Sequence, residues 1–191
     1  MIATFILYAR TLRYLRFRQI FYRFWRLRPR LIAPLSETLC LRTPQASLCP
    51  PVKKPVSMIG PEKFSFLNRE DELPSSHDWS ALGDGLLWQY NLHYFDDLTA
   101  INSAERASWH NAFINRWITS QPFGSSVSWD AYPLSLRAVN WIKFHHSGTK
   151  LSPKMQENLA QQIHWLSHQI EWHLCGNHLF ANAKALIVGG C

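Results

Sequence analysis

The sequence lacks long hydrophobic runs and closely spaced cysteines, and each absence excludes a class of protein. The apolar stretch at residues 2–9 is too short to cross a bilayer, and no small-residue cleavage site follows it before the arginines resume. The cysteines at positions 40, 49, 175 and 191 show neither metal-ligand spacing nor close pairs. We therefore expect no transmembrane helix, no cleavable signal peptide, no metal and no cofactor. The cysteines are therefore expected to be unpaired buried thiols or to lie in a reducing compartment. The default location is the cytoplasm, and the alternative is the periplasm.

Acidic residues are absent from residues 1–30, which hold eight arginines. Phe17, Ile20, Phe21 and Phe24 recur at the spacing of one helix face while arginines occupy another, so this segment is predicted to form a basic amphipathic helix ending near Pro29. Three roles remain open for it: lying on an anionic membrane surface, gripping an acidic polymer, or docking its apolar face on the protein. Nucleic acid is not an expected partner, because no nucleic-acid motif accompanies the arginines.

The remaining chain divides into a proline-rich segment and a helical one. Prolines recur through residues 31–84, which predicts a linker and loop with one short strand near Phe64. From residue 85 to 191, helical patterns dominate and no substantial strand separates them. Successive antiparallel helical hairpins then predict an all-α architecture. The helices are expected at 86–98, 105–120, from Pro133 to about 146, at 153–174 and at 178–187.

A corner near the end of the chain concentrates polar side chains. An apolar face repeats at helical spacing through residues 159–174, so a helix is predicted to reach residue 174 and to end at Gly176. Asn177 is then expected to cap the next helix, with His178 beside it. On residue types alone, a cap and a packed or solvated histidine explain this corner without any function.

Three stretches of the chain are similar to motifs of the heparinase II/III-like family of polysaccharide lyases. They are LWQYNLHYFDDL at 87–98, WDAYPLSLRAVNWI at 129–142 and GNHLFANAKAL at 176–186. They follow the order and rough spacing of that family, and the resemblance covers the chain from about Phe64 onward. It implies an incomplete (α/α) toroid followed by a large antiparallel β-sandwich. The sandwich is absent and the chain stops at Gly189-Gly190-Cys191, so we expect the truncated N-terminal part of a longer lyase.

The resemblance also implies a reaction, β-elimination in a uronate-containing polysaccharide. A base removes the C5 proton beside a carboxylate, and donors on that carboxylate stabilise the developing charge. By resemblance, Asn177 holds the carboxylate and His178 neutralises it or acts as the base. Four further residues are predicted to bind this acidic polysaccharide: Tyr90, His93, Tyr132 and Arg137. The family's catalytic tyrosine and its sandwich histidine have no counterpart here, so we expect the chain alone to be inactive.

Alternatives from other classes remain open. One is a non-catalytic protein that binds acidic glycans through its aromatic helices, and another is a membrane-surface helical protein governed by residues 1–30. The spacing of His164, His168 and Glu171 at i, i+4 and i+7 also permits a divalent metal, against the simpler interpretation of a solvated polar helix face.

Overall fold

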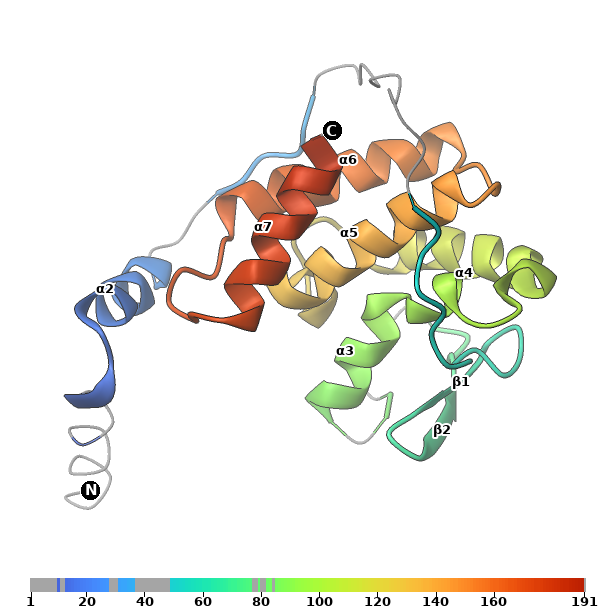
Figure 1. Ribbon diagram of the computed structural model, residues 1–191, viewed down its shortest axis with the longest axis horizontal. Coiled ribbons are helices and arrows are strands. Elements are labelled where there is room, and N and C mark those ends of the chain that lie inside the picture. Colours follow the sequence, from blue (N-terminus) through green and yellow to red (C-terminus); the bar gives the residue numbers. More distant parts are fainter. Residues whose placement is uncertain are drawn as a thin grey trace.

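The computed structural model describes residues 10, 13–27, 31–36, 49–76, 79, 82–83 and 85–190, and this part of the chain is mostly helical (Figure 1). Its helices are α2 (Phe17–Arg26), α3 (Leu86–Tyr94), α4 (Ala107–Ser120), α5 (Ala131–His146), α6 (Pro153–His168) and α7 (Asn177–Gly190). Single 3₁₀ turns are η1 (Asp96–Thr99), η2 (Ser103–Arg106) and η3 (Val127–Trp129). None of the helices in the described ranges is long and apolar enough to cross a membrane.

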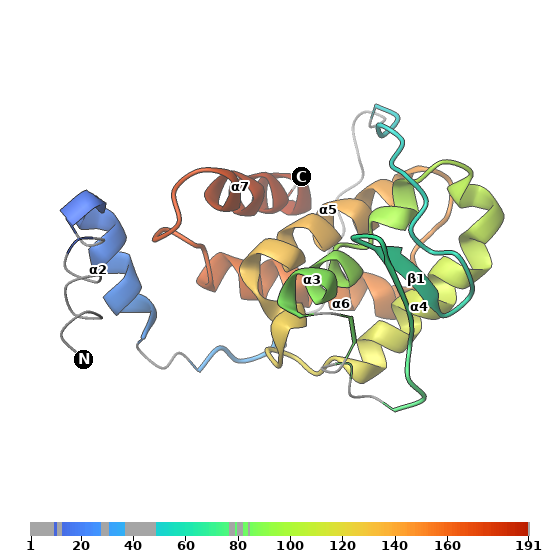
Figure 2. The same cartoon turned by 90° about the horizontal axis from the view of Figure 1, so that it is seen from below.

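Helix α5 lies at the centre and contacts α3, α6 and α7 (Figures 1 and 2). Its residues are small or apolar around most of the circumference, and a helix of this kind is stable only when neighbours cover it on several sides. Leu134, Ala138 and Trp141 have no exposed surface. The predicted helical character of residues 85–190 is thus confirmed, with α5 as the element that brings the other helices together.

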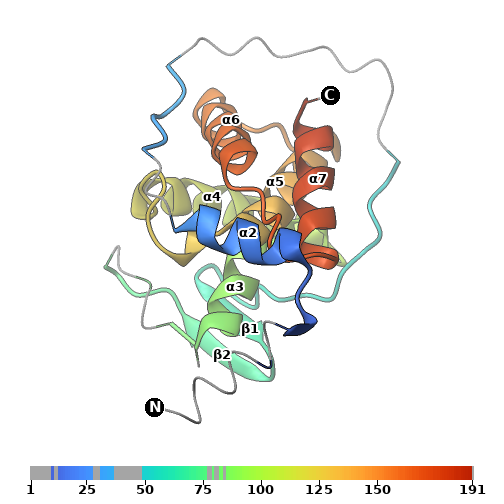
Figure 3. The same cartoon turned by 90° about the vertical axis from the view of Figure 1, so that its left-hand side faces the viewer.

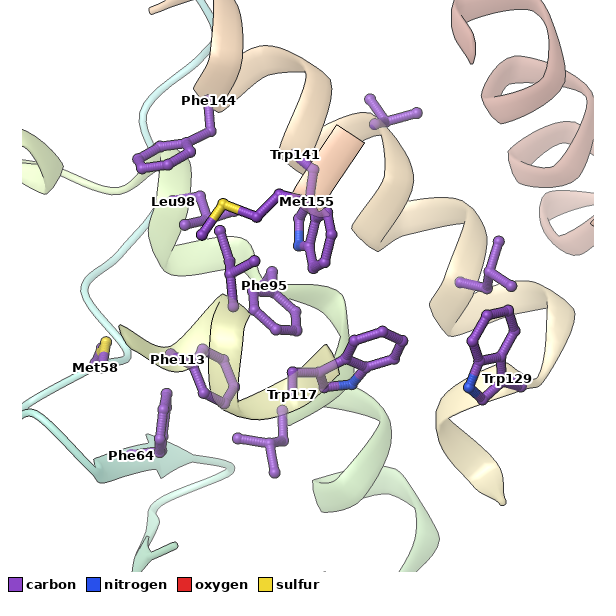
Figure 4. Close-up of a cluster of buried hydrophobic side chains, with 14 of the residues drawn as sticks. Met58, Phe64, Phe95, Leu98, Phe113, Trp117, Trp129, Trp141, Phe144 and Met155 are labelled. Atoms are coloured by element: carbon purple, nitrogen blue, oxygen red, sulfur yellow. The ribbon is translucent and has the colours of Figure 1, made fainter. Parts of the chain in front are cut away.

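An aromatic core joins α4 to α5 and to the turn after α3 (Figure 4). The ring of Phe95 stacks on that of Phe113 at 4.3 Å between centroids, and Trp117 meets Trp141 edge to face at 5.8 Å. Both arrangements are favoured for aromatic pairs. Phe113 and Trp117 lie four residues apart on α4 and are both buried, so the face of α4 that carries them forms part of the core.

Within the predicted linker and loop at 31–84, the described residues 54–73 fold onto the helices instead of forming an extended linker. Strand β1 (Lys63–Phe66) confirms the predicted short strand, and it pairs antiparallel with β2 (Arg69–Glu72), Lys63 opposite Glu72. Met58 and Phe64 are buried in the core. Prolines prevent a helix here, but the extended backbone still needs acceptors for its N–H groups, and the Asp97 carboxylate accepts from Ser57 and Met58 at 2.8 and 3.0 Å.

The corner before α7 also differs from its prediction. Helix α6 ends at His168, and residues 169–176 form an irregular connection instead of a continued helix. Gly176, at φ 101°, supplies the first carbonyl of α7 by accepting from the Phe180 N–H at 3.0 Å, so it occupies the capping position predicted for Asn177. The connection departs from the helix because the Glu171 N–H donates to the side chain of Asn182 in α7 at 2.9 Å.

The basic helix is shorter than predicted. Arg16 has extended backbone immediately before α2, so the helix does not run unbroken through residues 1–30. The parts of the prediction at 1–9, 11–12 and 28–30, Pro29 included, lie outside the described residues. Figures 1 and 3 show α2 at one end of the molecule, beside the connection between α6 and α7.

Candidate functional site

Side chains from three helices and one connection meet where α5 and α7 begin. The imidazole of His178 lies flat against the ring of Tyr132, with 4.2 Å between the ring centroids and 28° between their planes. On its other side, the Nδ1 atom of His178 is 3.2 Å from the carboxylate of Glu171. We call the set the His178 cluster: Tyr90, Asp130, Tyr132, Glu171, His178 and Asn182.

Hydrogen bonds with Asn182 hold Glu171 next to His178. Glu171 is buried, its backbone N–H donates to the side-chain Oδ1 of Asn182, and the side-chain Nδ2 of Asn182 donates to the Glu171 carboxylate at 3.3 Å. The same amide donates to the hydroxyl of Ser135 in α5 at 3.0 Å. An ionised carboxylate only accepts hydrogen bonds, so when Glu171 is ionised Nδ1 of His178 is the donor in this contact. Nε2 makes no hydrogen bond to the described residues, and the side chain is 29% exposed.

The tyrosines of α3 form the next part of the cluster's surroundings. The Tyr90 hydroxyl donates to Asp130 at 2.6 Å. Burial, the bond to Asp130 and the nearby charge of Glu171 all raise the pKa of Tyr90, which therefore stays neutral. Tyr94 meets Tyr132 edge to face at 6.0 Å, and burial, with the neighbouring Tyr132 and Asp96, raises its pKa to about 12. These phenols are neutral polar groups on an aromatic wall.

Asn177 is exposed as the first residue of α7, next to His178. The first N–H groups of a helix have no partner within the helix, and its N-terminal end carries a partial positive charge. Helix α7 makes its first such bond from Phe180, which leaves the N–H groups of residues 177–179 without a helical acceptor. The corner thus presents backbone donors, an amide and an imidazole on one exposed surface.

Two predicted substrate contacts are instead part of the core. His93 is buried and its Nδ1 accepts from the Trp117 indole at 3.2 Å; burial and the nearby Arg137 lower its pKa to about 3. Arg137 has no exposed surface, donates to Gln162 and to the Ser128 carbonyl at 2.8 Å each, and lies 4.0 Å from the centre of the Trp117 ring. Buried side chains offer no surface to a polymer, so we correct their assignment from substrate contacts to packing and hydrogen bonding.

The metal hypothesis on α6 is wrong. The rings of His164 and His168 are 4.8 Å apart, but α6 ends at His168 and Glu171 faces His178 instead. Across the described ranges, no group of three or more potential ligands could hold a metal ion. Of the cysteines, Cys49 and Cys175 are free and exposed, which corrects the expectation of buried thiols at these two positions; positions 40 and 191 lie outside the described residues.

A separate cavity of about 290 Å³ lies at the opposite end of α5. Its lining includes Lys53, Lys143 and His146, of which the last two belong to the final turn of α5. Cations at the C-terminal end of a helix complement its dipole, which accounts for their presence. The cavity and the His178 cluster are therefore independent features of the molecule.

The partners of His178 were not predicted as such. Asn182 lies four residues after His178, and this helical spacing in the sequence places the two side chains on the same face of α7. For Glu171, the spacing in the sequence indicates only a possible metal ligand. Comparisons of the chain with models of protein families, with curated proteins and with solved structures found no match.

Proposed function

We propose that the His178 cluster binds a uronate residue of an acidic polysaccharide and belongs to the site of a β-eliminating lyase of the heparinase II/III-like type. The observation that carries the proposal is the contact between the buried Glu171 carboxylate and Nδ1 of His178, which leaves Nε2 without a hydrogen bond to the described residues. A histidine oriented through one nitrogen is suited to chemistry at the other.

The neutral form of this imidazole has the properties of a general base. With the proton on Nδ1 held by Glu171, Nε2 carries a lone pair that can accept the C5 proton of a uronate. The electrons of the broken C–H bond form the C4–C5 double bond as the glycosidic oxygen leaves C4. The charged form would instead neutralise the substrate carboxylate. The two roles predict opposite pH dependence, because activity from a base rises with pH and activity from a counter-charge falls.

Asn177 and the start of α7 suit the carboxylate of the same sugar. The exposed amide and the N–H groups of residues 177–179 are donors, and the helix dipole adds a favourable potential for an anion. Donors placed on this carboxylate stabilise the negative charge that develops when C5 loses its proton. Tyr132 presents a flat ring next to the imidazole, a surface on which a pyranose can stack.

The architecture that accompanies this proposal is a partial (α/α) toroid. Its support is the sequence of helices α3 to α7 joined without intervening strands, and the central position of α5. In such an arrangement the starts of α5 and α7 lie at the same end of the domain, where Tyr132 and His178 meet. The expectation that the chain alone does not cleave substrate stays a prediction, tested by the absorbance of unsaturated uronate on alginate, heparan and bacterial acidic glycans.

Binding of the chain to a polyuronate tests the proposal directly. The ligand is alginate, and the matched comparison is carboxyl-reduced alginate, which keeps the sugar rings and loses the charge. We expect Asn177→Ala and His178→Ala each to weaken alginate binding about tenfold or more, since hydrogen bonds to a charged group contribute about 1.5–3 kcal/mol.

The matched controls are Asn115→Ala and His146→Ala, which remove the same residue types from exposed positions elsewhere. They should leave the affinity unchanged. Equal binding to the carboxyl-reduced polymer would refute uronate recognition. Alginate binding that persists in both Asn177→Ala and His178→Ala would place it elsewhere on the chain, with the N-terminal arginines as the first candidates.

A further inference from the structure

Helix α2 exposes the apolar face that a docked amphipathic helix would bury. Phe17, Phe24 and Leu27 are 81%, 66% and 78% exposed, and Phe21 is 47% exposed. Their spacing places them along one face of the helix. Single exposed apolar side chains are ordinary, but a contiguous set on one helix face indicates an interaction surface.

The contact between α2 and the rest of the protein explains why this face remains exposed. The ring of Tyr22 stacks on Trp172 at 6.0 Å, and the guanidinium of Arg18 lies 4.9 Å from the same indole. Arg18 and Tyr22 lie on a side of α2 next to its apolar face. The helix therefore touches the connection between α6 and α7 through a polar edge, at the end of the molecule seen in Figure 3.

Positive charge surrounds the exposed face. Arg13, Arg16, Arg18 and Arg23 are exposed, and the sequence contains no acid among its first 30 residues. A partner must therefore accept phenyl rings and supply negative charge. The surface of an anionic bilayer meets both requirements, because aromatic side chains enter the boundary between headgroups and acyl chains while arginines meet lipid phosphates and carboxylates.

An acidic polysaccharide and a second copy of the chain each meet only one of these requirements. An acidic polysaccharide supplies negative charge but little apolar surface for Phe17, Phe24 and Leu27. A second copy of the chain would bury these rings but would bring two sets of arginines together, and like charges at an interface are unfavourable. We propose that α2 binds the surface of an anionic membrane, with its phenylalanine face at the headgroup level and its arginines against the lipid charges. This proposal is independent of the His178 cluster.

Co-sedimentation of the full chain with lipid vesicles tests the proposal. One set of vesicles is phosphatidylcholine, and the other is an equal mixture of phosphatidylcholine and phosphatidylserine. We expect much stronger binding to the second set. Binding should weaken as salt rises above about 0.1 M, because the attraction between exposed charges is screened beyond a Debye length of roughly 10 Å. Each arginine near the surface contributes about a fivefold change in partitioning.

Paired variants separate the two contributions. Phe21→Ser with Phe24→Ser removes apolar surface, and its matched control is Phe180→Ser, which is 71% exposed on α7. Arg16→Gln with Arg23→Gln removes charge, and its control is Lys150→Gln with Lys154→Gln, both exposed elsewhere. The arginine pair should lower binding about 25-fold, the phenylalanine pair by at least tenfold, and neither control should change it. Circular dichroism verifies that each variant keeps its helix content.

Three results would overturn the proposal. Vesicle binding unchanged in the phenylalanine pair would show that charge alone is responsible. Equal binding to both vesicle types would remove the role of the arginines. A chain that is dimeric in light scattering, becomes monomeric on Phe21→Ser with Phe24→Ser and ignores vesicles would assign the face to a second copy of the protein.

Discussion

Helices α2 and α4 carry the same kind of sequence pattern, yet one exposes its aromatic face and the other buries it. In α4, Phe113 and Trp117 are 5% and 0% exposed, whereas Phe17 and Phe24 in α2 are 81% and 66% exposed. The spacing of aromatic residues in each helix follows the helical period. The period thus identifies which side of a helix is apolar but not what that side contacts.

The difference arises from the segments that reach each helix. Phe95, in the turn after α3, stacks on Phe113 of α4, and Trp141 of α5 meets Trp117 of α4 edge to face. By contrast, α2 meets Trp172 at its polar edge. The arginines of α2 explain this preference, because burying a charged side chain without a partner is costly and arginines flank the apolar stripe. Charge beside an apolar face is therefore the sequence feature that distinguishes the two helices.

The largest expected effect tests this contrast in stability. Trp117→Ala should lower the free energy of unfolding by about 3–5 kcal/mol, because it leaves a cavity in the core. It also removes the indole that lies against Arg137 and donates to His93. Phe24→Ala should change it by less than about 0.5 kcal/mol, as an exposed position does. Urea denaturation of both variants measures the difference, and a similar cost at both positions would mean that α2 is buried in solution.

A second test concerns the Asp97 carboxylate, which attaches residues 57–58 to the core. Burial alone would raise the pKa of Asp97, but hydrogen bonds from His110, Arg106 and the backbone of residues 57–58 hold it far below its ordinary value. Asp97→Asn should cost about 3 kcal/mol at neutral pH, because it removes one partner from a buried charged network.

The pH dependence of Asp97 has a defined sign. A carboxyl whose folded pKa is depressed stabilises the protein above its unfolded pKa, about 3.9, and loses that contribution as pH falls toward the folded pKa. The difference in unfolding free energy between wild type and Asp97→Asn should therefore shrink below about pH 4. A difference that stays constant down to acid unfolding would show that the carboxylate is not stabilised by its neighbours.

His93 supplies a third and smaller test at neutral pH, where His93→Gln should cost about 1–2 kcal/mol. Because the folded pKa of about 3 lies below the unfolded value of about 6.5, the unfolded chain binds more protons between these values. Wild type should then lose stability as pH falls through this window, and His93→Gln should lose less. The control His146→Gln, at an exposed position, should follow wild type; a variant slope equal to wild type would contradict the burial of a neutral His93.

The smallest expected effect concerns the contact of α2 with the body. Trp172→Ala removes one stacking and one cation–π contact, each contributing about 0.5–1 kcal/mol at an exposed site. Amide hydrogen exchange in α2 should accelerate while exchange in α4 stays unchanged. If unfolding of the whole domain is destabilised by more than this, α2 contributes to the core and the contrast with α4 fails.

The positions of helices and one strand could be predicted because their signals are local. Pro153 and Ser152 begin α6, where the Ser152 hydroxyl accepts from the backbone N–H of Met155, and β1 lies at the predicted strand. Local signals failed where a distant partner competes. Helix α6 ends early because the Glu171 N–H donates to Asn182 instead of continuing the helix, and the proline-rich segment folds because Asp97 accepts its backbone donors.

Local sequence signals also identify part of the candidate site. Asn177, His178, Tyr90 and Tyr132 lie at or near the surface. The contact of Tyr132 with His178 brings the stretches 129–142 and 176–186 together. His93 and Arg137 belong to the same motifs but point into the core. Which residues of a motif face outward depends on the neighbours that cover each helix, and those neighbours come from other parts of the chain.

Local patterns in the sequence indicate about where α3 to α7 begin, which of their faces are apolar, and that positive charge gathers before residue 31. Each of these depends on side chains within a few residues of one another and on the hydrogen-bond period of a helix. Packing between distant segments specifies which apolar faces are buried and how His178 is oriented. Those properties depend on residues far apart along the chain, such as Asn182 and Ser135, 47 residues apart, which meet only when α7 packs on α5.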